Sequence, residues 1–143
     1  MFMGQYNHTV DAKGRLSIPS KFREQLGEEF VITKGMDGCL FVFDNQNWAE
    51  FEEKLSALPM GKIETRQYTR FFLAGATQVE VDKQGRILLS TQLRSFAGLE
   101  KDVVLVGVGK RIEIWSMEKW AEMEADVDMD EITAAMADFG LTF

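Results

Sequence analysis

Two short segments of the sequence combine an aspartate, a glycine and an arginine at the same spacing, and each has a lysine between the aspartate and the glycine. The first reads Val-Asp-Ala-Lys-Gly-Arg at residues 10–15, and the second reads Val-Asp-Lys-Gln-Gly-Arg at residues 81–86. An aspartate at the start of a turn can accept hydrogen bonds from backbone N–H groups, and glycine readily adopts the positive φ that many turns require. We therefore expect a hairpin turn at each segment, with basic side chains at or beside it.

The basic side chains of these turns allow two interpretations. They are Lys13, Arg15, Lys83 and Arg86. Arginine can contact phosphates or guanine edges, so two turns related by an approximate two-fold axis could face one DNA duplex together. Alternatively, each arginine pairs with the aspartate four positions before it, Asp11 or Asp82, and stabilises the turn. The two interpretations are compatible, and the sequence leaves both open.

The two turns belong to a longer internal repeat. The segment VDAKGRLSIPSKFR at residues 10–23 recurs 71 residues later as VDKQGRILLSTQLR at residues 81–94. Each copy continues into a glycine and an apolar run and then, at a spacing of 72, into the triplet Trp-Ala-Glu at residues 48–50 and 120–122. Such an ordered match is improbable by chance, so we interpret the chain as a duplication of a unit of about 45 residues.

The first half of each unit predicts a hairpin followed by a short helix. In the first copy, strands over residues 9–10 and 15–18 flank the turn. Pro19 cannot continue a central strand, and Ser20 can cap a short helix that ends at a glycine. The second copy has Ser90 at the position of this proline, so we do not expect the two helices to begin in the same way.

The second half of each unit predicts another hairpin followed by a longer helix. Apolar runs bounded by glycines are typical of strands. The four runs are residues 30–33, 39–43, 103–106 and 112–115. Asp44 and Ser116 stand four residues before the paired tryptophans, and both residue types are good helix N-caps. In the first copy, this helix is expected to bury Trp48, Phe51 and Leu55.

The repeat divides the chain into four parts. We expect a first module at residues 5–47, a helical connection at 48–75, a second module at 76–119 and an acidic helical C-terminal tail at 120–143. Residues 62–73 within the connection have helical spacing. No flexible linker rich in serine and glycine separates the two units, so we expect them to share one core.

The net charge of −7 argues at first against nucleic acid, because DNA affinity comes largely from lysine and arginine. The negative charge is concentrated in residues 117–143, which contain eight acidic residues and one basic residue, so the rest of the chain has no net charge. Residues 11–23 contain four basic residues and one acidic residue, and residues 62–70 contain three and one. This segregation is expected of a protein with one basic face.

Five segments along nearly the whole chain resemble the MraZ family. They are GQYNHTVDAKGRLSIPSKFR at residues 4–23, RFFLAGA at 70–76, DKQGRIL at 82–88, LRSFAGL at 93–99 and EIW at 113–115. The resemblance implies a β-rich α+β fold: two tandem SpoVT-AbrB-type swapped-hairpin modules, in a pseudo-two-fold arrangement, that form one double-split β-barrel with flanking helices. The leucine-leucine-serine-threonine segment of the second copy departs from the serine-isoleucine-proline-serine of the first.

The resemblance also implies a function. It implies a sequence-specific DNA-binding transcription regulator that binds repeated promoter elements of the division and cell-wall gene cluster as a ring-shaped homo-oligomer. In that family the D-x-x-x-R motifs are the expected DNA contacts. We therefore predict a DNA site of Asp11, Lys13, Arg15, Asp82, Lys83 and Arg86, with Lys21, Arg23 and Arg94 as secondary candidates.

The sequence also indicates where the protein acts and what it does not bind. No run of about 18 apolar residues could span a membrane, and the N-terminus lacks the features of a secretory signal. We expect a cytoplasmic, nucleoid-associated protein without a cofactor, a small-molecule substrate or enzymatic activity. The alternative is a protein–protein scaffold or antitoxin-like module, which the duplication disfavours because such antitoxins usually carry one module and a disordered tail.

Other residues with possible chemistry have simpler interpretations. His8 is the only histidine and Cys39 the only cysteine, so metal sites and catalytic triads have little to draw on. We expect His8 to be a plain strand residue and Cys39 an unreactive core residue. The acidic run that begins at Asp126 lacks the glycine and later glutamate of a calcium loop. An apolar stripe that includes Ile132 and Phe139 is expected to dock on its own core or on a neighbouring subunit.

Overall fold

The computed structural model describes residues 1–143, with eight strands in two antiparallel sheets. The larger sheet has six strands in the order β1-β7-β8-β4-β3-β5, and the smaller consists of β2 and β6. The bounds are β1 Phe2–Thr9, β2 Arg15–Ser17, β3 Glu29–Lys34, β4 Leu40–Phe43, β5 Thr77–Glu80, β6 Arg86–Leu88, β7 Asp102–Gly109 and β8 Ile112–Ser116. The fold is therefore α+β with a mostly antiparallel sheet.

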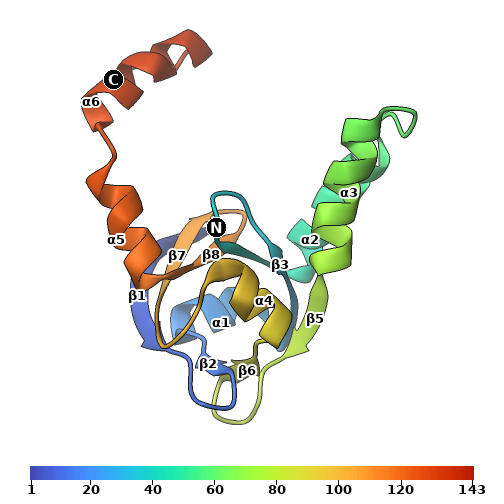
Figure 1. The fold of residues 1–143 in the computed structure, drawn as a ribbon, viewed down its shortest axis with the longest axis vertical. Coiled ribbons are helices and arrows are strands. Elements are labelled where there is room, and N and C mark those ends of the chain that lie inside the picture. The colour runs from blue at the N-terminus through green and yellow to red at the C-terminus, as the bar shows by residue number, and fades with distance from the viewer.

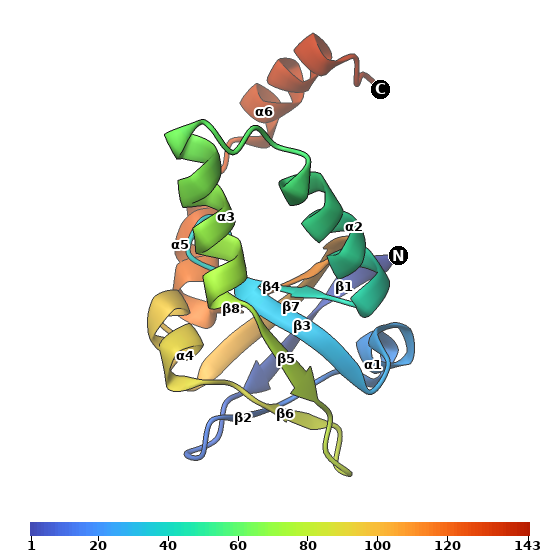
Figure 2. The ribbon, with the colours of Figure 1, turned by 90° about the vertical axis from the view of Figure 1, so that its right-hand side faces the viewer.

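Six α-helices and one short 3-10 helix complete the fold. They are α1 Ser20–Leu26, α2 Asn45–Ser56, α3 Ile63–Gly75, α4 Thr91–Ala97, α5 Met117–Ala125, α6 Met129–Met136 and η1 Ala137–Phe139. The β2–β6 pair and its two turns form one end of the molecule, and the helical pairs α2–α3 and α5–α6 extend from the other (Figures 1 and 2). We call these the turn end and the helical end. No helix is long and apolar enough to cross a membrane.

The strands of the two halves interleave. β1 pairs with β7, β5 pairs with β3, and β2 pairs with β6. Exchanging each strand of the first half for its counterpart in the second only reverses the strand order, so the topology has an approximate two-fold symmetry. The residues at the centre of two pairings are themselves repeat equivalents: Leu16 lies opposite Ile87, and Phe41 lies opposite Glu113. The expected sharing of one core is confirmed, whereas closure of the strands into a barrel stays an expectation.

The main core is built equally from both halves. Ten of its 20 buried residues come from each half, and Leu16 and Ile87 are among the least exposed, at 0% and 1%. A second cluster of seven buried residues contains Phe41, Phe72 and Trp115 and lies beneath α2 and α3. Burial of a large apolar side chain contributes about 1.5–3 kcal/mol, so neither half could retain its stability without the other.

The predicted helix caps agree with the structure in two of three cases, Asp44 and Ser116. Asp44 Oδ1 accepts a hydrogen bond from the Asn47 N–H at 2.7 Å, and Ser116 Oγ accepts one from Lys119 at 3.0 Å. Ser90 caps α4, so the two short helices begin differently, as expected. The expectation for Ser20 is wrong: it is the first residue of α1, and Pro19 precedes it as the N-cap without a side-chain hydrogen bond. The proline ring fixes the backbone φ of the residue before α1, so this helix begins without a side-chain cap.

Two termini of the chain differ from expectation. β1 extends from Phe2 to Thr9 and pairs with β7 along its whole length, whereas the sequence predicted a strand over residues 9–10 alone. β1 is an exposed edge strand with many polar residues and no apolar pattern, so its residues offer no signal for a strand. Its backbone hydrogen bonds to β7 hold it in the sheet. At the other terminus, the prediction that the apolar stripe docks on its own core is wrong, because no residue of α5 or α6 is buried and Phe139 is 81% exposed. Docking on a neighbouring subunit stays a prediction.

Cys39 lies in the core immediately before β4, as expected. Its side chain is fully buried, and Sγ donates a hydrogen bond to the Met36 carbonyl over 3.1 Å. Burial raises the pKa of the Cys39 thiol to about 12. The thiol therefore stays protonated at neutral pH and is a poor nucleophile.

Candidate nucleic-acid interface

The first basic turn is built around the Asp11 side chain. Its Oδ1 accepts hydrogen bonds from the backbone N–H groups of Lys13 and Arg15, both over 2.9 Å. The Gly14 N–H donates to the Asp11 carbonyl at 3.0 Å, and Gly14 has a φ of +84°. An aspartate that satisfies two backbone donors and a glycine in the left-handed region are the features that the sequence predicted for this turn.

The second turn repeats this geometry 71 residues later. Asp82 Oδ1 accepts from the N–H groups of Gln84 and Arg86 over 2.8 and 2.9 Å. The Gly85 N–H donates to the Asp82 carbonyl over 3.0 Å, and the φ of Gly85 is +78°. The duplicated motif therefore produces two turns of nearly the same shape.

The arginines of both turns form the ion pairs that the sequence left as one of two interpretations. Arg15 Nε lies 2.7 Å from Asp11 Oδ2, and Arg86 Nε lies 3.0 Å from Asp82 Oδ2. Only Nε of Arg15 is engaged in this way, so its two terminal nitrogens have no hydrogen-bond partner in the protein. Arg86 differs, because its Nη2 also donates to Gln84 Oε1 over 2.8 Å. Ion pairing thus orients each guanidinium and leaves terminal donors for another acceptor.

The same contacts determine the charge of the aspartates. The backbone hydrogen bond from Arg15 lowers the pKa of Asp11 below its usual value of 3.8, and the bond from Arg86 lowers the pKa of Asp82 in the same way. A further contribution comes from the arginine side chains. Both carboxylates are therefore ionised at neutral pH and offset part of the positive charge of each turn.

Arg23 and Arg94, two of the secondary candidates, each contact the turn of the other half; Arg23 is exposed and Arg94 is half-buried. Arg23 Nε donates to the Ile18 carbonyl at 2.9 Å, and Arg94 Nε donates to the Leu89 carbonyl at 3.1 Å. The guanidinium of Arg23 lies against Gly85, where a Cβ would come within 2.8 Å of its Cζ. That of Arg94 lies against Gly14 at a corresponding 3.1 Å. Each arginine thus supports the turn of the opposite half.

Backbone hydrogen bonds also tie each turn to the opposite half. The Ile18 N–H donates to the Gly85 carbonyl, and the Leu89 N–H donates to the Gly14 carbonyl, both over 2.9 Å. With the antiparallel β2–β6 pairing, these bonds fix the two turns at opposite ends of the short β2–β6 ribbon, and both project from the same end of the molecule (Figures 1 and 2). This crosswise support does not follow from the order of residues along the chain, although the glycine of each turn and the arginine eight residues after the turn's arginine recur in both copies.

The remaining lysines of the predicted site are exposed. Lys13 and Lys83 lie on the two turns, and Lys21 lies on α1. The acidic C-terminal helices begin at the opposite, helical end of the molecule (Figure 1). The basic turns are thus separated in space from the acidic helices, whereas the second basic segment, residues 62–70, lies with α3 at the helical end. No cluster of three or more histidine, cysteine, aspartate or glutamate side chains could hold a metal ion.

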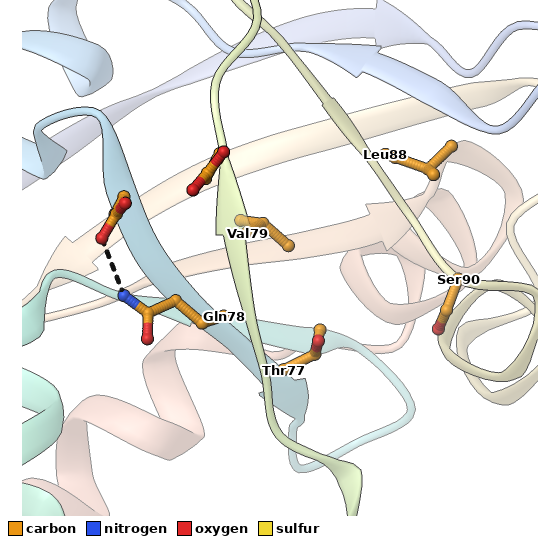
Figure 3. Close-up of a pocket in the computed structure, with 7 residues that line it drawn as sticks. Thr77, Gln78, Val79, Leu88 and Ser90 are labelled. Atoms are coloured by element: carbon orange, nitrogen blue, oxygen red, sulfur yellow. Dashed lines mark hydrogen bonds between the residues drawn. The ribbon is translucent and has the colours of Figure 1, made fainter.

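The largest surface cavity lies elsewhere, between β5 and the segment that follows β6 (Figure 3). It has a volume of about 690 Å³, and its polar side chains include Glu29, Gln78, Glu80 and Ser90. Gln78 Nε2 donates to Glu29 Oε2 over 3.2 Å, so the Glu29 carboxylate already has a hydrogen-bond partner in the protein. The lining contains no lysine, arginine, histidine or cysteine, so it offers neither a base beside a nucleophile nor a cationic site for phosphate.

Comparison with known proteins gives a consistent result over the full length. A family model described as "MraZ protein, putative antitoxin-like" matches the chain twice, at residues 1–71 and 72–140. A relative from Lachnoclostridium phytofermentans, named "Transcriptional regulator MraZ", is 58% identical over 143 residues and covers 100% of both chains. Relatives with the same name from Caldanaerobacter subterraneus subsp. tengcongensis and Moorella thermoacetica are 54% and 52% identical, over 99% of this chain and 100% of theirs. The double match agrees with the internal repeat.

Proposed function

Because the chain belongs to the MraZ family, we propose that it is a transcription regulator that binds double-stranded DNA through its two basic turns. The observation that carries this proposal is the pair of turns itself. Two exposed turns of nearly the same shape project from the same end of the molecule (Figures 1 and 2), and each presents a lysine together with an arginine that is oriented by its aspartate. A symmetric pair of this kind suits the symmetric backbone of a duplex.

Each residue of the turns has a distinct role in this proposal. Arg15 and Arg86 direct their terminal nitrogens to guanine edges or phosphates, and Lys13 and Lys83 neutralise phosphates. The negative charges of Asp11 and Asp82 repel DNA phosphates, so these residues act indirectly. They hold the arginines and the turn backbone in place. Arg23 and Arg94 support the turns from behind, so their loss would act on DNA binding through the turn geometry.

A single subunit offers little DNA-binding surface for a chain of net charge −7. We infer that several copies assemble into a ring or another closed homo-oligomer, which presents many turns to repeated promoter elements and gains affinity through avidity. The elements that we propose are those of the division and cell-wall gene cluster. The same proposal includes closure of the strands into a double-split β-barrel and a nucleoid-associated location in the cytoplasm.

The competing candidate is an antitoxin-like protein–protein module, which the description of the matching family favours. In that case the turns would be structural and the protein would bind a protein toxin. The names of the relatives and the exposed donors of the turns favour the regulator. DNA binding to the organism's own division-cluster promoter separates the two candidates.

The decisive experiment is a binding and footprinting titration on that promoter with wild type and the variant Arg15→Ala/Arg86→Ala. A lost base-edge contact costs about 1–3 kcal/mol, so we expect each substitution to weaken binding about 5–150-fold while the fold is retained. Lys13→Ala should flatten the dependence of log affinity on log salt, by a slope of about 0.9 for one phosphate contact. The matched control is Lys54→Ala/Lys110→Ala, which removes two exposed charges away from the turns.

The proposal fails if the double arginine variant retains both the affinity and the salt dependence of the wild type but melts at a lower temperature. The arginines would then be structural partners of their aspartates, as the ion pairs at 2.7 and 3.0 Å alone would allow. Absence of any footprint with wild type would instead favour the antitoxin-like candidate.

A further inference from the structure

The C-terminal arm, residues 117–143, exposes apolar side chains that nothing in the chain covers. Neither α5 nor α6 contains a buried residue. Met129 is 60% exposed, Ile132 39% and Phe139 81%. The arm leads away from the sheet and touches no other helical pair (Figure 1). Exposed apolar side chains at helical spacing mark a surface that another molecule covers.

The arm is also uniformly acidic beyond its first residues. Residues 120–143 contain seven acidic residues and no lysine or arginine. Asp128 caps α6 by accepting from the N–H groups of Asp130 and Glu131 over 3.1 and 3.3 Å, so the acidic residues belong to an ordered helix start. A surface that is both acidic and apolar requires a partner that is both basic and apolar.

The internal symmetry identifies the position at which a helix is missing. In the first half α3 covers α2, and the rings of Phe72 and Phe51 meet edge to face with centroids 5.1 Å apart. Trp120 and Met123 on α5 occupy the repeat positions of Trp48 and Phe51, but no counterpart of Phe72 lies against them. The Trp120 Nε1 atom is buried and has no hydrogen-bond acceptor. In the first half α2 is therefore paired with α3, whereas in the second half α5 has no helix packed against it in the corresponding way.

The outer side of α3 has the complementary character. Ile63, Arg66, Arg70 and Leu73 follow one another at intervals of three or four residues and lie opposite Phe72, which faces the core. Ile63 is 47% exposed and Leu73 40%. We call these four residues the basic face of α3. It is the side of the helical end on which arginines and exposed apolar residues occur together.

We propose that the C-terminal arm of one copy docks on the basic face of α3 of a second copy. The acidic residues of α6 then lie near Arg66 and Arg70, and Ile132 and Phe139 cover Ile63 and Leu73. This inference rests on the homo-oligomer of the proposed function and names the surfaces that form it. Each copy provides an arm to one neighbour and receives an arm from another, so the contact is head-to-tail and can close into a ring.

The structure disfavours the same contact within one chain. α5 begins at the residue directly after β8, so it cannot swing across the molecule, and only residues 126–128 separate it from α6. α5 and α3 stand on opposite sides of the helical end (Figure 1). An arm held at a distance from α3 of its own chain remains available to α3 of a neighbour.

Two charge-reversal variants test the proposal through the mass measured by light scattering at micromolar concentration. Arg66→Glu/Arg70→Glu reverses the charge of the basic face of α3 and also removes the hydrogen bond from Arg66 Nη1 to the Met60 carbonyl (3.0 Å), and Asp130→Lys/Glu131→Lys alters only the arm. We expect wild type to form one large species and each variant alone to fall toward the 16.3 kDa subunit. An equimolar mixture should regain the wild-type mass, because one mixed contact is native and the other has both charges reversed. The quadruple variant should assemble by itself.

Matched controls carry two reversals of the same sign away from both surfaces. They are Lys21→Glu/Lys83→Glu and Glu24→Lys/Glu28→Lys, all exposed positions near the turn end, and both should keep the wild-type mass. If wild type is oligomeric but the variants keep its mass, the inference is wrong while the DNA-binding proposal stands. If wild type is a monomer and the arm variant changes only its hydrodynamic radius, the arm folds on its own chain. That result overturns both this inference and the proposed oligomer. The footprint reports on DNA binding independently.

Discussion

The two ends of the molecule have preserved the duplication to different degrees. At the turn end, both halves contribute a turn with the same hydrogen bonds, a bracing arginine and one strand of the β2–β6 pair. At the helical end, α2 and α3 are followed by β5, which pairs in the sheet. α5 is followed by α6 and η1, which lead away from the sheet. The symmetry is retained where two equivalent basic turns are presented together. It is lost at the helical end, where the head-to-tail contact that we propose would need two different surfaces.

The largest expected effect tests the symmetry of the turn end. Leu16 and Ile87 face each other at the centre of the β2–β6 pair and are almost fully buried. Leu16→Ala and Ile87→Ala should each lower the free energy of unfolding by about 2–5 kcal/mol, because each leaves a cavity in the shared core. Urea unfolding of both variants measures this. Effects that differed by more than about 2 kcal/mol would contradict equivalent packing of the two halves.

A smaller effect is expected from the glycine of a turn. Gly85→Ala places a Cβ at a φ of +78° and within 2.8 Å of Arg23, so both the backbone and the bracing arginine must shift. The left-handed conformation alone costs about 1–2 kcal/mol for a residue with a side chain. Gly109→Ala isolates this conformational cost, because Gly109 has a φ of +94° with no atom within 4 Å of its Cβ position.

Thermal melting and DNA titration distinguish these two glycine variants. Both should melt at a lower temperature than wild type, and Gly85→Ala should in addition weaken DNA binding, because it displaces the second turn. Equal DNA affinity for Gly85→Ala and wild type would show that the shape of this turn is not needed for binding.

The smallest expected effect concerns the pH dependence of stability. The pKa values of Asp11 and Asp82 are lowered in the folded protein, mainly by backbone hydrogen bonds from Arg15 and Arg86. A lowered pKa stabilises the folded state above the unfolded value of 3.8, and this contribution is lost as the pH falls through the folded pKa.

Melting temperatures of wild type and Asp11→Asn/Asp82→Asn, followed from neutral pH into the acid range, test this dependence. Wild type should be the more stable protein at neutral pH, and the difference should shrink below pH 3.8. A difference that stayed constant across this range would exclude the ionised aspartates as its cause.

Much of the candidate site was predictable from residue types and spacing. Asp11, Gly14 and Arg15 predict a hairpin turn, and their recurrence at residues 82–86 predicts a second turn of the same kind. The structure shows both turns and both ion pairs. The prediction that failed within a repeat unit was the cap at Ser20, where Pro19 takes the N-cap position. Whether the turn residues contact DNA is a proposal that the titrations above address.

The crosswise support of the turns could not be predicted in the same way. Arg23 and Arg94 appeared as two more basic residues after each turn, and their charge alone suggested an additional DNA contact. In the structure, each Nε donates to a backbone carbonyl and each guanidinium lies against the glycine of the opposite turn. Only the pairing of β2 with β6 brings these groups together.

The sequence by itself determined the duplication, the turns, most helix caps and the segregation of charge. These features depend on interactions within a few residues, such as an aspartate that accepts from the next N–H groups or a glycine at positive φ. The tertiary structure decided which strands pair across the halves, that Arg23 and Arg94 brace the turns, and that the C-terminal arm remains uncovered. These outcomes depend on burial and backbone pairing between residues about 70 positions apart, which local preferences do not specify.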